Sequence, residues 1–165
     1  MVVFCKEFQL RHENEQDSII GGLAMPKGST TQADVLAALL SGTDPSYRSG
    51  SNLFIALHTA SPAGGDQTTN EVTTTAYVSY TRYTLAKSGA WTPSGSTYSN
   101  AATITFATCT GGTSPVVTYY SIGVGSATPA AASQMLYYGP LSTPVTVTNG
   151  QAPAFAGGTL QISEV

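Results

Sequence analysis

Charged side chains are scarce in this chain of 165 residues, and one long stretch has none at all. Asp, Glu, Lys and Arg make up 9% of the sequence, whereas about 25% is typical of globular proteins. The 76 residues from Ser88 to Ser163 contain no charged residue and no histidine. General acid–base catalysis, phosphate binding and most metal sites need such groups. We therefore expect this half of the chain to act through shape and assembly.

Basic residues and long apolar runs are also few. The formal net charge is −3, which predicts no basic surface for nucleic acid. No apolar run approaches the roughly 18 residues that a membrane-spanning helix needs. The first residues lack the apolar stretch and cleavage site of a secretory signal. We expect neither a nucleic-acid partner nor a membrane partner, and synthesis in a cytoplasm.

The two cysteines, Cys5 and Cys109, lie far apart and neither has metal-ligand spacing around it. The simpler interpretation is a buried, reduced thiol at Cys109 and an incidental Cys5. The alternative is a disulfide between subunits or between arm and body, which a reducing compartment disfavours. Because a surface with so few charges tends to associate, self-assembly is expected.

Residues 1–28 are predicted to form an extended N-terminal arm and linker. Its apolar side chains recur at even positions, which is typical of one face of a strand, although two of them also fit a short helix. An isolated polar arm should fray, so we expect it to dock on a neighbouring subunit, for example by strand addition. The candidate attachment residues are Val2, Phe4, Phe8, Leu10 and Arg11.

Residues 29–165 are predicted to form a single domain that begins with a short helix at about residues 31–41. Thr31 is the expected N-cap, Asp34 the capping-box partner, and Gly42 the C-terminal stop. The apolar face of this helix should lie on the sheet body or on a partner. That face consists of Val35, Leu36, Leu39 and Leu40.

From about residue 52 to 165 the apolar residues alternate with period two, and turn residues are frequent. This pattern predicts an all-β fold, an antiparallel β-sandwich that is jelly-roll-like and has about eight strands. Residues 53–58 are apolar on both faces and should form a central strand. The other expected strands span 77–85, 104–106, 116–124, 135–138, 145–147, 152–155 and 160–162. Loops are expected around 93–95, 110–112 and 148–150.

His58 is the main candidate for chemistry, and two arrangements involve it. A Ser-His-Asp triad would use Ser61 and Asp66, but the sequence has no Gly-x-Ser-x-Gly elbow. A metal site would combine His58 with Asp66 and Glu71, a poor donor set with one histidine. The simpler interpretation is a strand-end histidine bonded to a loop carbonyl. No catalytic, cofactor-binding or metal residue, and no cofactor, is predicted.

Glu71 and Arg82 stand in a part of the chain that is nearly free of charge. An unpaired, half-buried charge is costly, so we interpret them as a structural ion pair that pins the 60s–70s loop to the following strand. Contact with a partner by either residue is the alternative.

Tyrosine is the commonest aromatic residue, with nine copies. Neighbouring strand residues face opposite sides, so each adjacent pair should have one ring inward and one outward. Tyrosine suits interfaces, and plain packing within the sandwich is the alternative. The candidate interface aromatics are Tyr119, Tyr120, Tyr137 and Tyr138.

Several motifs in a fixed order resemble a family of small phage virion proteins. They begin with the residues 53–62 (LFIALHTASP), 69–72 (TNEV) and 80–82 (YTR). Trp91, residues 100–106 (NAATITF) and residues 109–112 (CTGG) follow. The similarity covers roughly residues 30–160 and leaves the arm outside it. The resemblance implies a tail-fibre or other virion structural component. Similar β-sandwiches also serve as capsid cement, and the resemblance implies no enzyme activity.

We therefore predict a non-enzymatic bacteriophage virion structural protein. The preferred role is a capsid cement or decoration protein that ties the shell together through its arm and through self-association. Its expected partners are the major capsid protein and copies of itself, as a homotrimer. The alternative is a tail-fibre, baseplate or receptor-contacting component, for which a host glycan is a further expected partner. The expected location is the virion, after assembly in the host bacterial cytoplasm.

Overall fold

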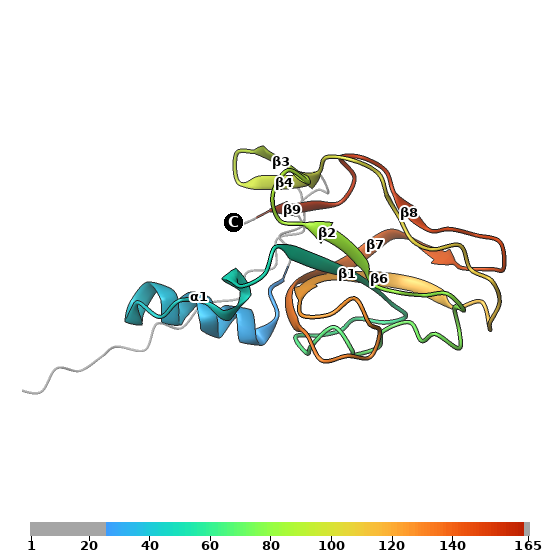
Figure 1. The fold of residues 1–165 in the computed structure, drawn as a ribbon, viewed down its shortest axis with the longest axis horizontal. Helices are drawn as coiled ribbons and strands as arrows, with labels where there is room; N and C mark the ends of the chain where they lie inside the picture. The colour runs from blue at the N-terminus through green and yellow to red at the C-terminus, as the bar shows by residue number, and fades with distance from the viewer. Residues whose placement is uncertain (1–25, 164–165) are drawn as a thin grey trace, which may run out of the picture.

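Nine strands and one α-helix make up residues 26–163, the part of the chain that the computed structural model describes (Figure 1). The helix is α1 (Ser29–Ser41), and a short 3-10 turn, η1 (Ser46–Arg48), follows it. The strands are β1 (Asn52–His58), β2 (Tyr83–Ala86), β3 (Trp91–Ser94), β4 (Thr97–Asn100), β5 (Ile104–Thr105), β6 (Val116–Val124), β7 (Gln134–Thr146), β8 (Ala154–Phe155) and β9 (Gln161–Ser163). The fold is thus the expected all-β antiparallel sandwich with one N-terminal helix.

The larger layer is a four-stranded antiparallel sheet with the strand order β2-β1-β6-β7. Strand β1 lies between two partners, which explains why both of its faces are apolar. It pairs with β6 from Phe54 opposite Gly123 to His58 opposite Tyr119. Strands β2 and β7 are the edges of this sheet.

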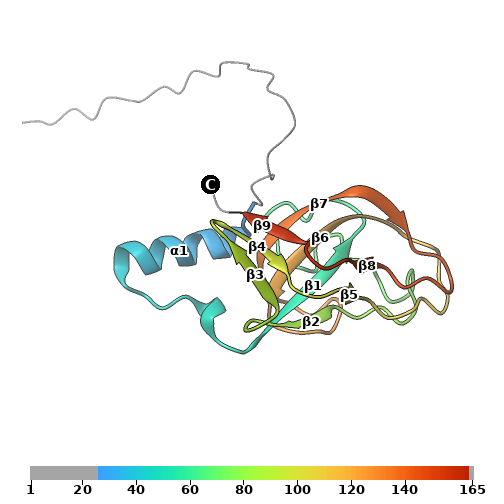
Figure 2. The same ribbon diagram turned by 90° about the horizontal axis from the view of Figure 1, so that it is seen from above.

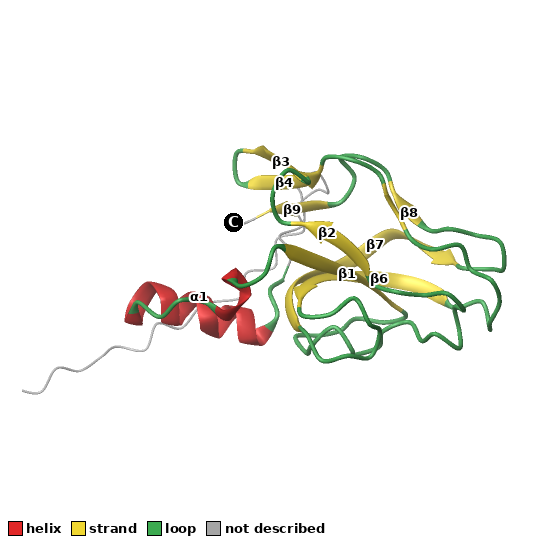
Figure 3. Cartoon of the chain, viewed as in Figure 1, coloured by secondary structure: helices red, strands yellow, loops and turns green. Residues whose placement is uncertain are grey.

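The second layer consists of two smaller sheets, with the orders β3-β4-β9 and β5-β8. Figures 1 and 3 show these strands on one side of the larger sheet. The core lies between the layers, where side chains of the larger sheet meet those of β5, β8 and β9. Its buried members include Ile55, Leu57, Val117, Ile122, Ile104, Phe106 and Leu160.

Helix α1 begins two residues earlier than expected, and its N-cap is Gly28 without a side-chain cap bond. The Thr31 hydroxyl instead donates to the Met135 carbonyl oxygen of β7 at 2.9 Å. The predicted cap at Thr31 was therefore wrong, because a buried tertiary partner competes for its hydroxyl. Gly42, at φ 65°, ends the helix in the left-handed region as predicted.

The helix extends away from the body of the molecule, as both views of the ribbon show (Figure 2). Thr31 is its buried residue, so the helix meets the sandwich chiefly through its first turns. Within residues 26–163 no helix is long and apolar enough to cross a membrane.

Three strand assignments from the sequence need correction. Residues 77–82 do not form a strand, since the Tyr80 amide donates a hydrogen bond to the Tyr77 carbonyl in a turn. Only Tyr83–Ala86 pair as a strand. The expected strands at 135–138 and 145–147 are parts of one long strand, β7, that runs through Gly139 and Pro140. The hairpin of β3 and β4 was missed because Pro93 and Gly95 were interpreted as a loop.

Candidate functional site

Arg82 and Glu71 form a buried, bidentate ion pair. Nε of Arg82 donates to Oε1 of Glu71 at 2.7 Å, and Nη2 donates to Oε2 at 2.9 Å. The exposed fractions of the two side chains are 0% and 4%. The carboxylate also accepts the backbone N–H of Ala130 at 2.9 Å and the hydroxyl of Tyr80 at 3.2 Å. The carboxylate therefore has four hydrogen-bond donors, which offset the cost of burying its charge.

The other N–H groups of Arg82 reach the loop that joins β6 to β7. Nη1 donates to the carbonyl of Ser126 and the hydroxyl of Ser133, both at 3.1 Å, and Nη2 donates to the carbonyl of Ala131 at 3.0 Å. All five guanidinium donors are used, so none is left for a ligand. The ion pair connects three segments: the loop before Glu71, the start of β2 and the β6–β7 loop. Its role is therefore structural.

His58 is fully buried at the end of β1 and is held at both ring nitrogens. Nδ1 lies 2.9 Å from the carbonyl oxygen of Thr69, and Nε2 lies 2.7 Å from Oγ of Ser121. A carbonyl only accepts, so Nδ1 carries the proton and Nε2 accepts the Ser121 hydroxyl. Burial lowers the pKa of His58, although the Thr69 carbonyl opposes this shift. The histidine is therefore neutral at physiological pH.

The Ser-His-Asp arrangement with Ser61 and Asp66 does not form. The Asp66 carboxylate accepts the backbone N–H and the hydroxyl of Thr68, and the Ser61 hydroxyl accepts the Ala63 N–H. The serine beside His58 is Ser121, and a backbone carbonyl takes the place of the aspartate. Since both His58 and Ser121 are 0% exposed, a substrate has no access to this pair.

His58, Asp66 and Glu71 do not form a metal site either. Residues 26–163 contain no group of three or more His, Cys, Asp or Glu side chains placed to hold an ion. Cys109 is a free, buried thiol that donates to the carbonyl of Gly111 at 3.1 Å. Cys5 lies outside the described residues.

Sequence reasoning missed the polar residues that surround His58. Nε2 of Gln67 donates to the Phe54 carbonyl at 2.8 Å and to Oγ of Ser121 at 3.2 Å. Ser121 is a small polar residue within the largely apolar run 116–124, and such an interruption is a signal of a buried hydrogen-bond network. Gln67 gave no comparable signal, because it lies in a loop of ordinary polar composition.

The candidate interface tyrosines divide between core and surface. Tyr120 is buried and its ring meets Phe155 edge-on, with 5.3 Å between ring centroids. Burial raises its pKa to about 12. Tyr119, Tyr137 and Tyr138 are half-buried. Tyr137 also packs against the core, so the rings of Tyr119 and Tyr138 are the better placed of the four for outside contacts.

The apolar face of α1 is largely exposed. The exposed fractions of Leu36, Leu39 and Leu40 are 57%, 76% and 81%. The polar side of the helix is anchored by Asp34, whose carboxylate accepts the Ser46 hydroxyl at 2.7 Å and the Gln134 amide at 2.9 Å. These bonds lower the pKa of Asp34. The helix is therefore fixed to the body while its leucines face outward, an arrangement typical of a contact surface.

The candidate attachment residues Val2, Phe4, Phe8, Leu10 and Arg11 lie outside the described residues. The described chain starts at Pro26 on the edge of the larger sheet, where Lys27 bridges Tyr137 of β7 in antiparallel fashion.

One comparison with known proteins places the chain in a family. The family model described as "Podophage GP4 fiber I protein gp80" matches residues 27–163. This range is nearly the whole of the described part, from the first bridge to the last strand. No curated protein matches the chain.

Proposed function

The chain belongs to the podophage GP4 fiber I protein gp80 family, and from this we propose that it is a non-enzymatic subunit of a podophage tail fibre. It is a phage structural protein and a component of the virion. The observation that carries the proposal is the extent of the match, because it covers every strand and the helix.

The side-chain chemistry of the described residues supports an assembly role over catalysis. All guanidinium N–H groups of Arg82 donate to Glu71 or to groups of the β6–β7 loop. The His58–Ser121 pair is buried away from solvent. Among the exposed large apolar side chains of residues 26–163, the three leucines of the projecting helix have the largest exposed fractions. Assembly through buried apolar area needs such a surface and needs no titratable group.

The leucines of α1 are the proposed contact with a neighbouring subunit. Full burial of one exposed leucine side chain contributes about 1.5–3 kcal/mol. Three of them on one helix contribute to a contact that is repeated in every copy, so that many such contacts act together in the assembly. Copies of this chain, as a homotrimer, are the proposed partners, and a host glycan is the proposed partner at the distal end of the fibre.

The capsid cement role, with the major capsid protein as partner, stays a prediction from the sequence. The copy number in purified particles separates the two roles. A fibre subunit should be present in a few to a few dozen copies, whereas cement should be present in hundreds. Quantitative mass spectrometry against the major capsid protein measures this ratio, and a value in the hundreds would refute the fibre assignment.

A substitution on α1 tests the contact surface. Leu39→Glu combined with Leu40→Glu should leave the unfolding transition in urea unchanged, because both side chains are already exposed. Incorporation into particles should fall. Val78→Glu, which adds a charge at another exposed apolar residue, is the matched control and should be incorporated normally. Equal incorporation of both proteins would exclude α1 as the contact.

A further inference from the structure

The two layers of the sandwich do not close fully on each other where β3, β4 and β9 cover the larger sheet. A pocket of about 430 Å³, here called the Trp91 pocket, opens between them. Apolar and aromatic side chains from both layers form its walls: Leu53, Ile122 and Tyr137 from the larger sheet, and Trp91, Tyr98 and Ile162 from the β3-β4-β9 sheet.

The exposure of Tyr98 shows that this end of the core is unfilled. Tyr98 lies directly opposite Ile162 in the register of β4 and β9, so the two side chains share one face of their sheet. Ile162 packs against the core, and this face is therefore the inner one. Inner faces of a sandwich normally interdigitate at high density, yet Tyr98 is 50% exposed. The pocket therefore has room for an apolar occupant.

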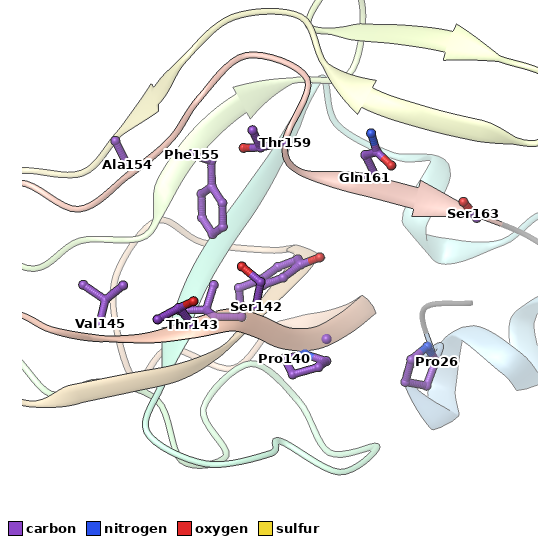
Figure 4. Close-up of a pocket in the computed structure, with 13 residues that line it drawn as sticks. Pro26, Pro140, Ser142, Thr143, Val145, Ala154, Phe155, Thr159, Gln161 and Ser163 are labelled. Carbon is purple, nitrogen blue, oxygen red and sulfur yellow. The ribbon is translucent and has the colours of Figure 1, made fainter. Parts of the chain in front are cut away.

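A second cleft, of about 520 Å³, lies between β7 and the β8–β9 region (Figure 4). Several of its lining side chains carry hydroxyl or amide groups, among them Ser142, Thr143, Thr159 and Gln161. An apolar occupant would cut these groups off from water without replacing their hydrogen bonds, which is costly. The Trp91 pocket is lined mostly by apolar and aromatic side chains and is the better receptor for leucines.

Helix α1 carries an occupant of the right shape. Leu36, Leu39 and Leu40 follow the spacing i, i+3, i+4, which places them on one face of the helix and is typical of helix-in-groove recognition. A core cavity of about 150 Å³ holds one benzene molecule, so the Trp91 pocket has room for three leucine side chains. No described residue of α1 lines this pocket, and the leucines are therefore available to the pocket of another copy.

The charges at the two surfaces also match. Among the described residues that line the Trp91 pocket, Lys87 is the charged one. Its Nζ donates to the carbonyl oxygens of Tyr47 and Ser49 at 2.7 Å and 2.8 Å, which fixes the ammonium group and uses two of its three N–H donors. The C-terminal end of a helix carries partial negative charge, and α1 has no basic residue in its last turn. The cation therefore complements the end of the helix that carries the leucines.

We propose that α1 of one copy inserts Leu36, Leu39 and Leu40 into the Trp91 pocket of a neighbouring copy. The contact is heterologous, and a closed ring uses every helix and every pocket once. Tryptophan and tyrosine, which line the pocket, are the residue types that dominate the binding energy of interfaces. The inference rests on the self-association proposed above and names the surface that receives α1.

The fluorescence of Trp91 provides a direct test, because it is the single tryptophan of the chain. The reporter protein, Leu39→Glu with Leu40→Glu, keeps the pocket and lacks the apolar helix face. The donor protein, Trp91→Phe with Tyr98→Glu, keeps the leucines, has no tryptophan and carries a charge in its own pocket. Addition of donor should shift the reporter emission to shorter wavelength and protect Trp91 from quenching by acrylamide.

The matched control is a donor that also carries Leu39→Glu and Leu40→Glu. Because each buried leucine contributes at least about tenfold to affinity, this control should bind the reporter at least about 100-fold more weakly. Urea unfolding of each protein checks that it is folded. An unchanged Trp91 signal with the folded donor, or an equal change with the control, would overturn the proposal.

This inference and the fibre assignment can fail separately. Reduced incorporation of the Leu39→Glu, Leu40→Glu protein into particles, combined with no response of Trp91 to the donor, would show that α1 contacts a different surface. Only the pocket would then be wrong. The copy number in particles tests the fibre assignment and does not depend on the pocket.

Acrylamide quenching of the unmodified full chain is an independent measurement, free of any folding defect in the variants. Quenching of Trp91 should increase on dilution, as copies dissociate and water enters the pocket. Strong quenching at every concentration would refute the proposal, because the pocket would then stay open. Protection that persists in the Leu39→Glu, Leu40→Glu protein would also refute it, because another segment or partner would then fill the pocket.

Discussion

Removal of the Arg82 guanidinium should be among the more damaging single changes in the described fold. In Arg82→Met the alkyl chain is retained, but the Glu71 carboxylate stays buried without its cation and the loop carbonyls of Ser126 and Ala131 lose their donor. Loss of one partner of a buried ion pair costs about 3–5 kcal/mol. With an m-value of about 2 kcal/mol/M, the urea midpoint should fall by roughly 2 M.

The chain provides its own control for this substitution. Arg48 pairs with Asp44 at 2.6 Å, but the exposed fractions of these side chains are 68% and 86%. Arg48→Met should therefore change the free energy of unfolding by about 0.5 kcal/mol or less. A double variant, Glu71→Leu with Arg82→Met, should lose less than the sum of the two single variants, because neither charge is then left alone. Equal losses for Arg82→Met and Arg48→Met would refute the structural role of the buried pair.

Two other predictions follow from the described contacts. The folded-state pKa of His58 is lowered below its ordinary value of 6.5, so the unfolded chain binds more protons in the window beneath pH 6.5. The free energy of unfolding should therefore fall as the pH drops through this window. Chemical denaturation at pH 7 and pH 5 should show this fall in the wild type, and a fall of the same size in His58→Gln would contradict it. Gly112→Ala should destabilise the fold by about 2 kcal/mol or more in thermal unfolding, because the new Cβ would lie 2.2 Å from the Ala76 carbonyl oxygen at a φ of +116°. Gly150→Ala is the control: its Cβ would enter open space, so it should cost only about 1 kcal/mol from its positive φ. Similar losses for the two variants would show that the close approach at Gly112 is unimportant.

Local patterns in the sequence predicted β1 and β6, the two strands of the larger sheet that have a partner on each side. Strand β6 spans residues 116–124 in both the prediction and the structure, because most of its side chains are apolar or β-branched. Edge strands gave weaker signals. Pro93 lies in β3, an edge strand where the missing N–H faces away from the sheet, and the same reasoning explains why Pro140 did not end β7.

The contacts of the candidate site also differ in how far the sequence alone could predict them. The pairing of Glu71 with Arg82 followed from the cost of isolated charge in a nearly uncharged body, a rule that needs no knowledge of topology. The partner of His58 depended on topology, because Ser121 lies 63 residues away on the neighbouring strand. The exposure of the α1 leucines also depends on how the helix leaves the body, which periodicity alone does not specify.

The second layer of the sandwich consists entirely of residues without charge. Strands β3, β4, β5, β8 and β9, together with β6 and β7, fall within residues 88–163, where no side chain ionises between about pH 3 and pH 7. Within residues 26–163, every Asp, Glu, Lys and Arg and the described histidine therefore precede Ser88. The second layer, together with strands β6 and β7, thus has no side chain through which a change of acidity in this range could act on it directly.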